Sequence, residues 1–585
     1  MEGLAEAASP HVLREYVLVA DGWRGAMVAP SGEMSWLCFP TWSDSAVFSG
    51  LIGGHGGYRV WPVDRHVRGG YYEDGSLIWR QRWVTQTGTL EVREALAFPG
   101  QRDQLLILRR LLVVDGTVRA RAALSIAAEY GHAGSVPWRR QGEYWTCAYP
   151  GVHAWWRGAG NARPDQEQAG LVADFDLAAG EHHDLVLHLS VRDDPMGADD
   201  LNPDELWRST EMAWSRAIPP CRDLEAAADL RRAFAVLRGL TTPGGATVAA
   251  ATTSLPERAQ AGRNYDYRYA WVRDTCYIGR AGASVPGAQA VLDDAVRWLT
   301  ERVLSDGAGT KPAYQVDGSA VPEPCHLGLP GYPGGSDVVG NPVGSQFQLD
   351  LFGEVLLILA RAAGLDRIDA DGWKAAEIAI DAIAQRYAEK ESGIWEIEPN
   401  LWTHSRLICV AGLRAIAQHG APGRWRTEAL TLADRLLSQA DRRCLHPSGR
   451  WQRAPDDRRV DASLLLAEVR GALPPHDPRS VATREAVLND LSQDFYLYRY
   501  SDPAKPLGES EGAFLVCNFW MVLAKLRAGE VTSAARWFER SRASSGSSGL
   551  FSEEYDVEQN QLRGNIPQAF VHALLIESAA ELSRA

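Results

Sequence analysis

The sequence lacks long hydrophobic runs and blocks of basic residues. No stretch of eighteen apolar residues is present to span a bilayer, and the acidic start MEGLAEAASPHVLREY has no apolar core of the kind found in secretory signals. Acidic residues (74) outnumber basic ones (60), so the net charge is −14. A nucleic-acid groove or an anionic membrane surface attracts the opposite sign of charge. We therefore expect a cytoplasmic protein that acts on a neutral small molecule, with no nucleic-acid or membrane partner. The oligomeric state stays open.

Clustered cysteines are also missing. The chain has eight cysteines, but they form no CxxC pair and no cluster with histidines. This scatter argues against a zinc site and against a disulfide framework. HExxH, P-loop and dinucleotide-binding motifs are absent as well. We expect neither a metal nor an organic cofactor.

The first third of the chain reads as β structure. TVRARAAL (117–124) alternates apolar and basic residues, and DLVLHLSV (184–191) alternates less cleanly. SLIWRQRWV (76–84) and TLEVREALAF (89–98) are short β-favouring runs between Gly, Asp and Pro. Short strands with turns between them predict antiparallel sheets packed as a β-sandwich over residues 1–217.

The remainder of the chain is helical. After IPPC (218–221), an amphipathic helix is expected within 218–245, which we assign to a linker, and residues 246–585 form the helical domain. Segments such as HSRLICVAGLRAIA (404–417) are apolar over most of their circumference, so they belong in an inner layer. Alternation with amphipathic helices predicts a toroid of helix pairs. The expected helices are 286–304, 349–363, 373–389, 405–418, 426–440, 460–472, 512–528, 531–543 and 567–583.

The segment NYDYRYAWVRD (264–274) combines three tyrosines and a tryptophan with two arginines and two aspartates. A sugar-binding surface needs this mixture, because pyranose CH faces stack on aromatic rings while hydroxyl groups bond to Arg and Asp. The alternative is a helix start whose aromatics are buried and whose charges pair with each other. The segment alone leaves both open.

Two acidic loops supply candidate catalytic carboxyls, Glu396 in SGIWEIEPNLW and Glu553 in GLFSEEYD. Glycoside hydrolysis needs one protonated carboxyl for the leaving oxygen and one ionised carboxyl to activate water. Desolvation beside Trp395 suits Glu396 to the acid role, and the polar neighbours of Glu553 are expected to keep it ionised as the base. The alternative is that both are ordinary solvated loop glutamates.

Taken together, these segments resemble glycoside hydrolase family 15, the glucoamylase and α-glucosidase family, in its bacterial form. The resemblance covers nearly the whole chain. GEMSWLCFPTWSDSAVFSGLIGG and GSLIWRQRWVTQTGTLEVREALAFPG resemble the N-terminal β-sandwich of bacterial members. NYDYRYAWVRD, GNPVGSQFQLDLFGEV, GIWEIE, YRYSDPAKPLGESEGAFLVCNFW and GLFSEEYD follow in the family's order. The resemblance implies that 246–585 is a catalytic (α/α)6 barrel and that the enzyme is exo-acting and inverting.

The resemblance also implies roles for individual residues. Glu396 matches the general acid and Glu553 the general base, with the carboxyl groups about 6.5–9.5 Å apart to admit a water. Eight further positions match residues that bind the sugar: Tyr267, Trp271, Arg273, Asp274, Trp395, Arg499, Asn341 and Gln348.

One segment departs from the family pattern. After the acid loop, bacterial relatives commonly read like HSKxMCWVALDRA, whereas this chain reads HSRLICVAGLRAIA. Val410 and Gly412 stand at or near the positions of a missing Trp and Asp. We expect this change, in the inner layer close to the acid, to bear on the choice of substrate.

The expected function is the release of β-glucose from non-reducing ends of short malto- or isomalto-oligosaccharides. A trehalase of the same family is the nearest alternative. A phosphorylase is a second, although it needs a cationic phosphate pocket in place of the base Glu553. A sugar-binding protein without turnover is a third, and the altered CVAGLRA segment (409–415) is the hint for it.

Overall fold

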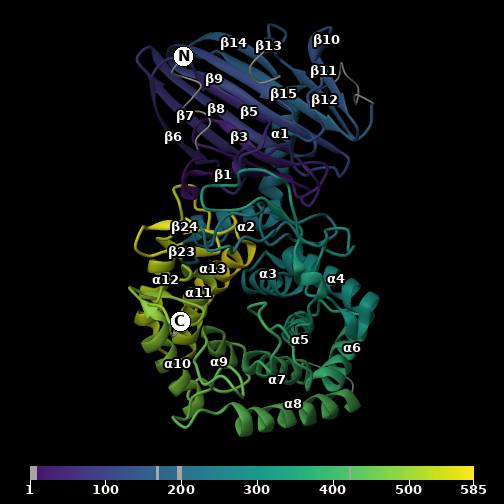
Figure 1. The fold of residues 1–585 in the computed structure, drawn as a ribbon, viewed down its shortest axis with the longest axis vertical. Helices are drawn as coiled ribbons and strands as arrows, with labels where there is room; N and C mark the ends of the chain where they lie inside the picture. Colours follow the sequence, from purple (N-terminus) through teal and green to yellow (C-terminus); the bar gives the residue numbers. More distant parts are fainter. Residues whose placement is uncertain (1–9, 166–169, 194–200, 420–422, 503) are drawn as a thin grey trace.

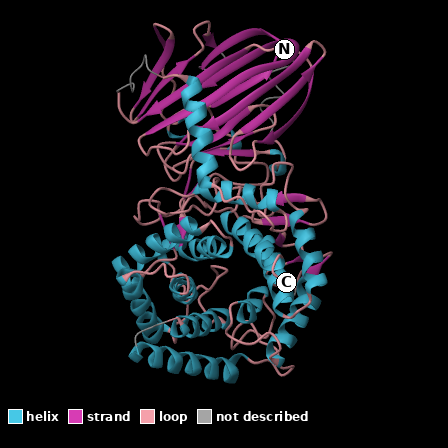
Figure 2. Ribbon diagram, turned by 180° about the vertical axis from the view of Figure 1, so that it is seen from behind, coloured by secondary structure: helices cyan, strands magenta, loops and turns pink. Residues whose placement is uncertain are grey.

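A computed structural model describes residues 10–165, 170–193, 201–419, 423–502 and 504–585. An antiparallel β domain stands on a ring of helices, and the chain crosses from the first to the second once (Figure 1). Figure 2 shows the ring from behind, with the long helix α1 running from the sheets down to it. The predicted order, an antiparallel sheet domain followed by an (α/α)6 barrel, is confirmed.

The β domain contains fifteen strands in the described residues, and all of its pairings are antiparallel. Their bounds are β1 Val17–Ala20, β2 Gly25–Val28, β3 Glu33–Cys38, β4 Ala46–Phe48, β5 Gly57–Pro62, β6 His66–Tyr72, β7 Trp79–Thr85, β8 Gly88–Leu96, β9 Gln104–Ser125, β10 Arg139–Gln141, β11 Tyr144–Tyr149, β12 Val152–Arg157, β13 Arg163–Asp165, β14 Gly170–Ala178 and β15 His182–Ser190.

Strand β9 joins the two layers. Its first part pairs with β8 and β15, and its second part, from Thr117 on, pairs with β5 and β14. The alternation in TVRARAAL now has its cause, because Val118, Ala120, Ala122 and Leu124 are buried while the residues between them are partly or fully exposed. One long strand thus belongs to both sheets of the sandwich.

Thirteen α-helices are described. Their bounds are α1 Pro203–Ala217, α2 Ala227–Leu240, α3 Val272–Ser284, α4 Gln289–Asp306, α5 Asp350–Ala363, α6 Ala370–Arg386, α7 Thr403–Gln418, α8 Gly423–Cys444, α9 Leu466–Val469, α10 Pro478–Leu491, α11 Leu515–Arg527, α12 Val531–Arg542 and α13 Ala569–Leu582. Short strands accompany the loops of the ring: β16 Ala270–Trp271, β17 Ala313–Tyr314, β18 Cys325–His326, β19 Val338–Val339, β20 Ser492–Gln493, β21 Tyr496–Leu497, β22 Ala513–Phe514, β23 Glu554–Asp556 and β24 Gln561–Arg563.

Six helices form a closed inner ring. Each of α3, α5, α7, α9, α11 and α13 contacts the next, and α13 contacts α3. Their burial explains the position, since α5, α11 and α13 are buried over nearly their whole length. Even-numbered helices lie outside them (Figure 1). The predicted inner place of HSRLICVAGLRAIA is confirmed as α7.

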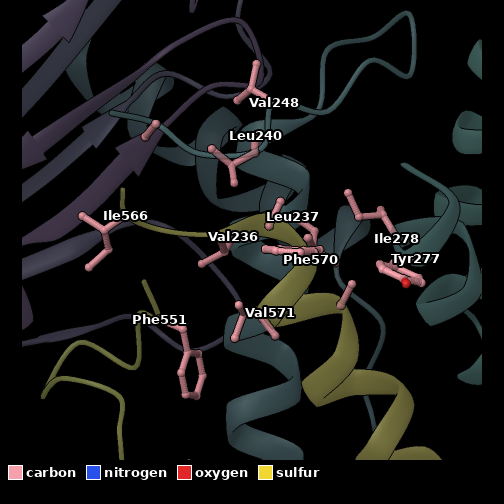
Figure 3. Packing of buried hydrophobic residues seen from close by; sticks show 14 of the residues in the cluster. Val236, Leu237, Leu240, Val248, Tyr277, Ile278, Phe551, Ile566, Phe570 and Val571 are labelled. Atoms are coloured by element: carbon pink, nitrogen blue, oxygen red, sulfur yellow. The ribbon is translucent and has the colours of Figure 1, made fainter. Parts of the chain in front are cut away.

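The ring closes where its first and last helices meet. Figure 3 shows Leu237 of α2, Ile278 of α3 and Val571 of α13 packed together. Helix α2 lies in the segment that we assigned to a linker, and it packs against α13. The division of the chain at residues 217 and 245 stays a prediction.

Three helices do not follow from the sequence analysis. Helix α1 falls in the stretch read as β, although Asn202 caps it and Pro203 occupies its first turn. Helices α3 and α10 are absent from the expected set, because charged residues interrupt their apolar faces. The expected helix 460–472 is a 3-10 turn, Ala462–Leu465, followed by the single-turn α9.

The altered segment after the acid loop has a packing role. A Cβ on Gly412 would lie 2.3 Å from the Gly353 carbonyl oxygen of α5, and a Cβ on Gly353 would lie 2.7 Å from the Ile408 carbonyl carbon. The two glycines therefore let α5 and α7 cross closely. Val410 is fully buried in α7, and neither position lines the cavity described below. Their placement gives no support to our expectation that they bear on substrate choice.

All eight cysteines are free thiols in the structure. Among the helices of the described residues, none combines the length and the apolar character that a bilayer crossing requires.

Candidate active site

A cavity of about 160 Å³ opens at the end of the barrel where the inner helices begin. We call it the site cavity. Most of its walls come from loops that lead into inner helices: Trp271 precedes α3, Trp395 and Glu396 precede α7, Phe514 precedes α11, and Gln568 precedes α13. The beginnings of the inner helices supply the rest, namely Arg273, Asp274, Trp520 and Phe570. Side chains from distant parts of the sequence therefore meet at one end of the ring.

The residues of NYDYRYAWVRD divide between the wall of the site cavity and a buried ion pair. Tyr267 and Trp271 face the site cavity, together with the arginine and aspartate that follow. Asp266 and Arg268 point elsewhere and form a fully buried ion pair at 2.6 Å. Arg268 also donates to the backbone oxygen of Asp44 at 3.1 Å, so this pair ties the barrel to the β domain.

The two candidate catalytic carboxyls are held by neighbouring aromatic residues. Tyr267 donates its hydroxyl proton to Glu553 Oε1 at 3.0 Å, and Trp271 donates from Nε1 to Glu396 Oε1 at 2.8 Å. The two rings pack edge to face with centroids 5.6 Å apart. Burial raises the pKa of Tyr267 well above its ordinary value, so its hydroxyl remains a donor. One rigid aromatic pair therefore holds both carboxyls against the site cavity.

The backbone of Glu396 is in the left-handed region, with φ of +55°. Non-glycine residues in this conformation concentrate at functional sites, where surrounding contacts hold them. Here the Glu396 amide donates to the Gly393 carbonyl oxygen at 3.2 Å. The side chain keeps 24% of its surface exposed, facing the site cavity.

Arg273 and Asp274 line the deep end of the site cavity in the first turn of α3. Arg273 Nη2 lies 3.4 Å from Glu396 Oε1, and its Nη1 donates to Gln348 Oε1 at 2.9 Å. Burial raises the pKa of Asp274 to about 7 against the opposing charge of Arg273. These two charged groups can bond to hydroxyls of a sugar, as the resemblance implies.

Two of the predicted sugar-binding residues are less direct. Gln348 is buried behind Arg273 and does not line the site cavity, so its contact with substrate is not supported. Asn341 does line the cavity, but both ends of its amide are engaged, with the Val343 amide and the Asp266 carbonyl oxygen. Both residues are placed to hold the loop before α5.

Trp395 presents its ring to the site cavity and is fixed from behind. Its indole Nε1 donates to both oxygens of Asp461, at 2.9 and 2.8 Å. The ring packs against Phe514 and Trp520, with centroids 5.5 and 5.8 Å away. Asp461 is the buried N-cap of the 3-10 turn before α9, so a further loop of the ring orients this wall.

The surroundings of Glu553 differ from our expectation. Sequence neighbours suggested a polar, solvated carboxylate, but Glu553 is only 4% exposed. Burial raises its pKa well above the usual range, the charge of Glu257 adds to this, and Arg499 and the Tyr267 hydroxyl oppose it. Tertiary burial therefore overrides the polar neighbours in the sequence. Glu554, the neighbouring carboxyl, does not line the site cavity and accepts from the Gly512 amide at 2.7 Å.

Arg499 lies in the site cavity at the centre of several carboxyls. It forms a two-point contact with Glu511, from Nε at 3.2 Å and from Nη2 at 2.6 Å. Its Nη2 also lies 3.5 Å from Glu257 Oε2 and 3.6 Å from Glu554 Oε1. Arg499 thus lines the site cavity, and its positive charge is shared among three glutamates. Its contact with a sugar stays a prediction.

Sequence reasoning missed several residues of the site cavity. Glu257, Arg263 and Tyr265 line it from the loop that precedes Tyr267, and Tyr500 and Phe570 complete the wall. Tyr265 is 39% exposed, whereas Asp274 is 3% exposed, so Tyr265 lies toward the mouth. Tyr265 and Tyr500 carried a detectable signal, because they lie within the motifs NYDYRYAWVRD and YRYSDPAKPLGESEGAFLVCNFW. Glu257 carried none.

Within the described ranges, one group of three side chains brings metal-type ligand atoms within 4.8 Å of one another: His182, Asp184 and Asp204. It belongs to the β domain and not to the site cavity. Arg110 already pairs with both aspartates, at 2.8 Å for Asp184 and 2.5 Å for Asp204.

The chain matches two family models and several known proteins. Residues 232–580 match glycosyl hydrolases family 15, and residues 4–141 match the trehalase-like N-terminal domain. Over 98% of its length the chain is 30% identical to a protein named trehalase from Mycolicibacterium smegmatis, covering 91% of that protein. A protein of the same name from Mycobacterium tuberculosis is 28% identical over 98% of this chain and 90% of its own.

A further relative and a solved structure are also similar to this chain. Trehalase 1 of Sulfolobus acidocaldarius is 30% identical over 60% of this chain and 63% of that protein. Among solved structures, a bacterial glucoamylase complexed with acarbose superposes with a TM-score of 0.73, covering 98% of this chain and 94% of that one. The identity to the glucoamylase is 14%, so this likeness establishes the fold alone.

Proposed function

Because the chain belongs to glycoside hydrolase family 15, we propose that this glycosidase hydrolyses α,α-trehalose with inversion at one anomeric carbon. The observation that carries the chemistry is that Glu396 and Glu553 line one cavity, each held by a member of the Tyr267–Trp271 pair. The substrate rests on the relatives named trehalase, two of which match nearly the whole chain. Malto- and isomalto-oligosaccharides, which the sequence analysis favoured, fit these relatives less well.

In the proposed reaction, one glucose of trehalose occupies the deep end of the site cavity, against Arg273 and Asp274. Glu396 donates a proton to the bridging oxygen as its bond to C1 breaks. Glu553 takes a proton from a water that attacks C1 from the opposite face. The bound glucose leaves as the β anomer, and the second glucose leaves as the α anomer because its own C1–O bond is never broken.

The test is glucose release from trehalose, maltose and isomaltose, with and without phosphate, and with fresh products observed by proton NMR. We expect α- and β-glucose from trehalose in equal initial amounts. Two α-glucose molecules would indicate retention and contradict the assigned roles of the two glutamates. Glucose 1-phosphate formed only with phosphate would establish the phosphorylase alternative instead. Release from maltose or isomaltose but not from trehalose would overturn the proposed substrate.

One variant tests the role of Glu553. Glu553→Gln should abolish turnover on every substrate, because no other carboxyl then accepts the proton of water. If that variant keeps near-wild-type turnover, the base assignment is wrong. Binding of trehalose without turnover by the wild-type protein would favour the sugar-binding alternative.

A further inference from the structure

A third carboxyl, Glu257, faces the site cavity and has no role in the reaction described above. It is 3% exposed, and its Oε2 is buried without a hydrogen-bond partner. The closest cation is Arg499, whose Nη2 lies 3.5 Å away. Arg499 makes its shorter contacts with Glu511. Glu257 is thus a buried carboxyl whose closest positive charge, Arg499, is bound at shorter distance by Glu511.

Glu257 and Glu553 flank the same glycine. A Cβ on Gly564 would lie 3.4 Å from Glu553 Oε2 and 3.8 Å from Glu257 Cγ. The Gly564 amide donates to the carbonyl oxygen of Pro256 at 2.8 Å, so the backbone next to Glu257 is tied to this point. Glu553 Oε2, like Glu257 Oε2, is buried without a partner. Two carboxyl groups, each with one buried oxygen that lacks a hydrogen-bond partner, therefore converge beside the site cavity.

The local charges do not balance if all carboxyls ionise. Glu511 takes most of the positive charge available, since it contacts Arg499 and also Arg263 at 2.5 Å. Although burial opposes ionisation, these arginines lower the pKa of Glu511. The remaining positive charge of Arg499 and Arg263 must stabilise three carboxyls, those of Glu257, Glu553 and Glu554. Like charges in a buried site ionise in succession rather than together.

The groups that face Glu553 come from every loop around it. Tyr267 lies in the loop before α3, and Glu257 and Arg263 lie earlier in the same loop. The others are Glu396 before α7, Arg499 and Glu511 before α11, and Glu554, the chain neighbour of Glu553. Among the charges that raise the pKa of Glu553, Glu257 acts most strongly, and burial raises the pKa of Glu257 itself.

On these grounds, which rest on the proposed function, we propose that Glu257 is a positioning residue that shares a proton with Glu553. Its charge sets the pH above which Glu553 can accept a proton from the attacking water. Glu257, being the closer of the two to Arg499, ionises first, and Glu553 ionises against its negative charge.

The experiment compares the pH dependence of kcat/KM for wild type and Glu257→Gln. Two substrates are used, trehalose and α-D-glucosyl fluoride. Fluoride leaves without a proton and carries no second sugar, so the fluoride substrate reports on the base side alone. We expect the acid limb of the Glu257→Gln profile to lie about one pH unit lower on both substrates, since removing a like charge lets Glu553 ionise earlier. The maximal rate should stay within about tenfold of wild type, because general-base help by Glu553 is retained.

The control variant changes a carboxyl that does not line the site cavity. Glu398→Gln removes an exposed carboxyl two residues beyond Glu396 and should leave the limb unmoved. An unmoved limb in Glu257→Gln would overturn the proposal. So would a loss on trehalose alone, which would make Glu257 a binding residue for the second glucose. If Glu257→Gln does not fold, Glu257→Asp must lower the limb by a smaller amount, and no movement there overturns the proposal equally.

The proposed function can fail separately. Wild-type protein that cleaves α-D-glucosyl fluoride but not trehalose would refute the substrate, while the pH comparison on the fluoride would still decide the role of Glu257.

Discussion

Replacing Tyr267 by phenylalanine removes a single hydroxyl, the one that donates to Glu553 Oε1 at 3.0 Å. The ring itself stays, so its edge-to-face packing on Trp271 is preserved. The change therefore isolates one hydrogen bond between a buried donor and the proposed base.

The size of the effect follows from the nature of that bond. A hydrogen bond to a charged group contributes about 1.5–3 kcal/mol, and each 1.36 kcal/mol corresponds to tenfold in rate. We expect kcat/KM for trehalose to fall by about 10- to 150-fold in Tyr267→Phe. The hydroxyl also favours the ionised form of Glu553, so its loss raises the pKa of Glu553 and moves the acid limb of the profile to higher pH. Glu257→Gln moves the same limb in the opposite direction.

The assay is the pH profile of kcat/KM together with thermal unfolding. Tyr332→Phe is the matched control, because its hydroxyl donates to the His11 carbonyl oxygen at 2.8 Å outside the site cavity. The control should lose about 1 kcal/mol of stability without a change in kcat/KM. Wild-type kcat/KM and an unmoved limb in Tyr267→Phe would refute the claim that this hydroxyl supports the base.

Three further substitutions test other parts of the structure. Glu396→Gln should bind trehalose with wild-type affinity by calorimetry but cleave it about 10²- to 10⁴-fold more slowly, whereas α-D-glucosyl fluoride should be affected much less; equal losses on both substrates would contradict an acid role. Gly412→Ala should lower the free energy of unfolding by about 1–3 kcal/mol, because its Cβ would meet the Gly353 carbonyl oxygen at 2.3 Å, and an unchanged melting temperature would show that the helices separate freely. Arg268→Met should cost about 3–5 kcal/mol in denaturant unfolding, since it leaves Asp266 buried without its partner, and a loss below about 1 kcal/mol would mean that this ion pair does not secure the two domains.

Much of the fold can be predicted from the sequence, because the inner helices must be apolar on all sides. Helices α5, α7, α11 and α13 lie within about three residues of the predicted segments for this reason. Helix α3 escapes prediction because charged residues interrupt its apolar pattern: its first turn carries Arg273 and Asp274, which line the site cavity. Helix α9 is a single turn, too short for a periodic pattern to reveal.

The candidate site is likewise only partly predictable from the sequence. Glu396 and Glu553 stand in acidic loops beside aromatic residues, so the sequence marks them. The surroundings that govern Glu553 are not visible there, because they come from Arg499 and Glu257 in other loops. Glu257 precedes an arginine in an ordinary polar stretch, PERAQAGRN, and its neighbours give no sign of burial. Residues whose role depends on tertiary charge are the ones that sequence reasoning misses.

The two proposed catalytic carboxyls both come from loops that lead into inner helices, yet their surroundings differ. Glu396 keeps part of its surface open to the site cavity, whereas Glu553 is enclosed, and burial works against its ionisation. A base in that position functions only if local partners restore the ionised form. Arg499 and the Tyr267 hydroxyl do so, and Glu257 opposes them. The pH range of the enzyme should therefore be governed by these few side chains, so that changes at Tyr267 and Glu257 displace it in opposite directions.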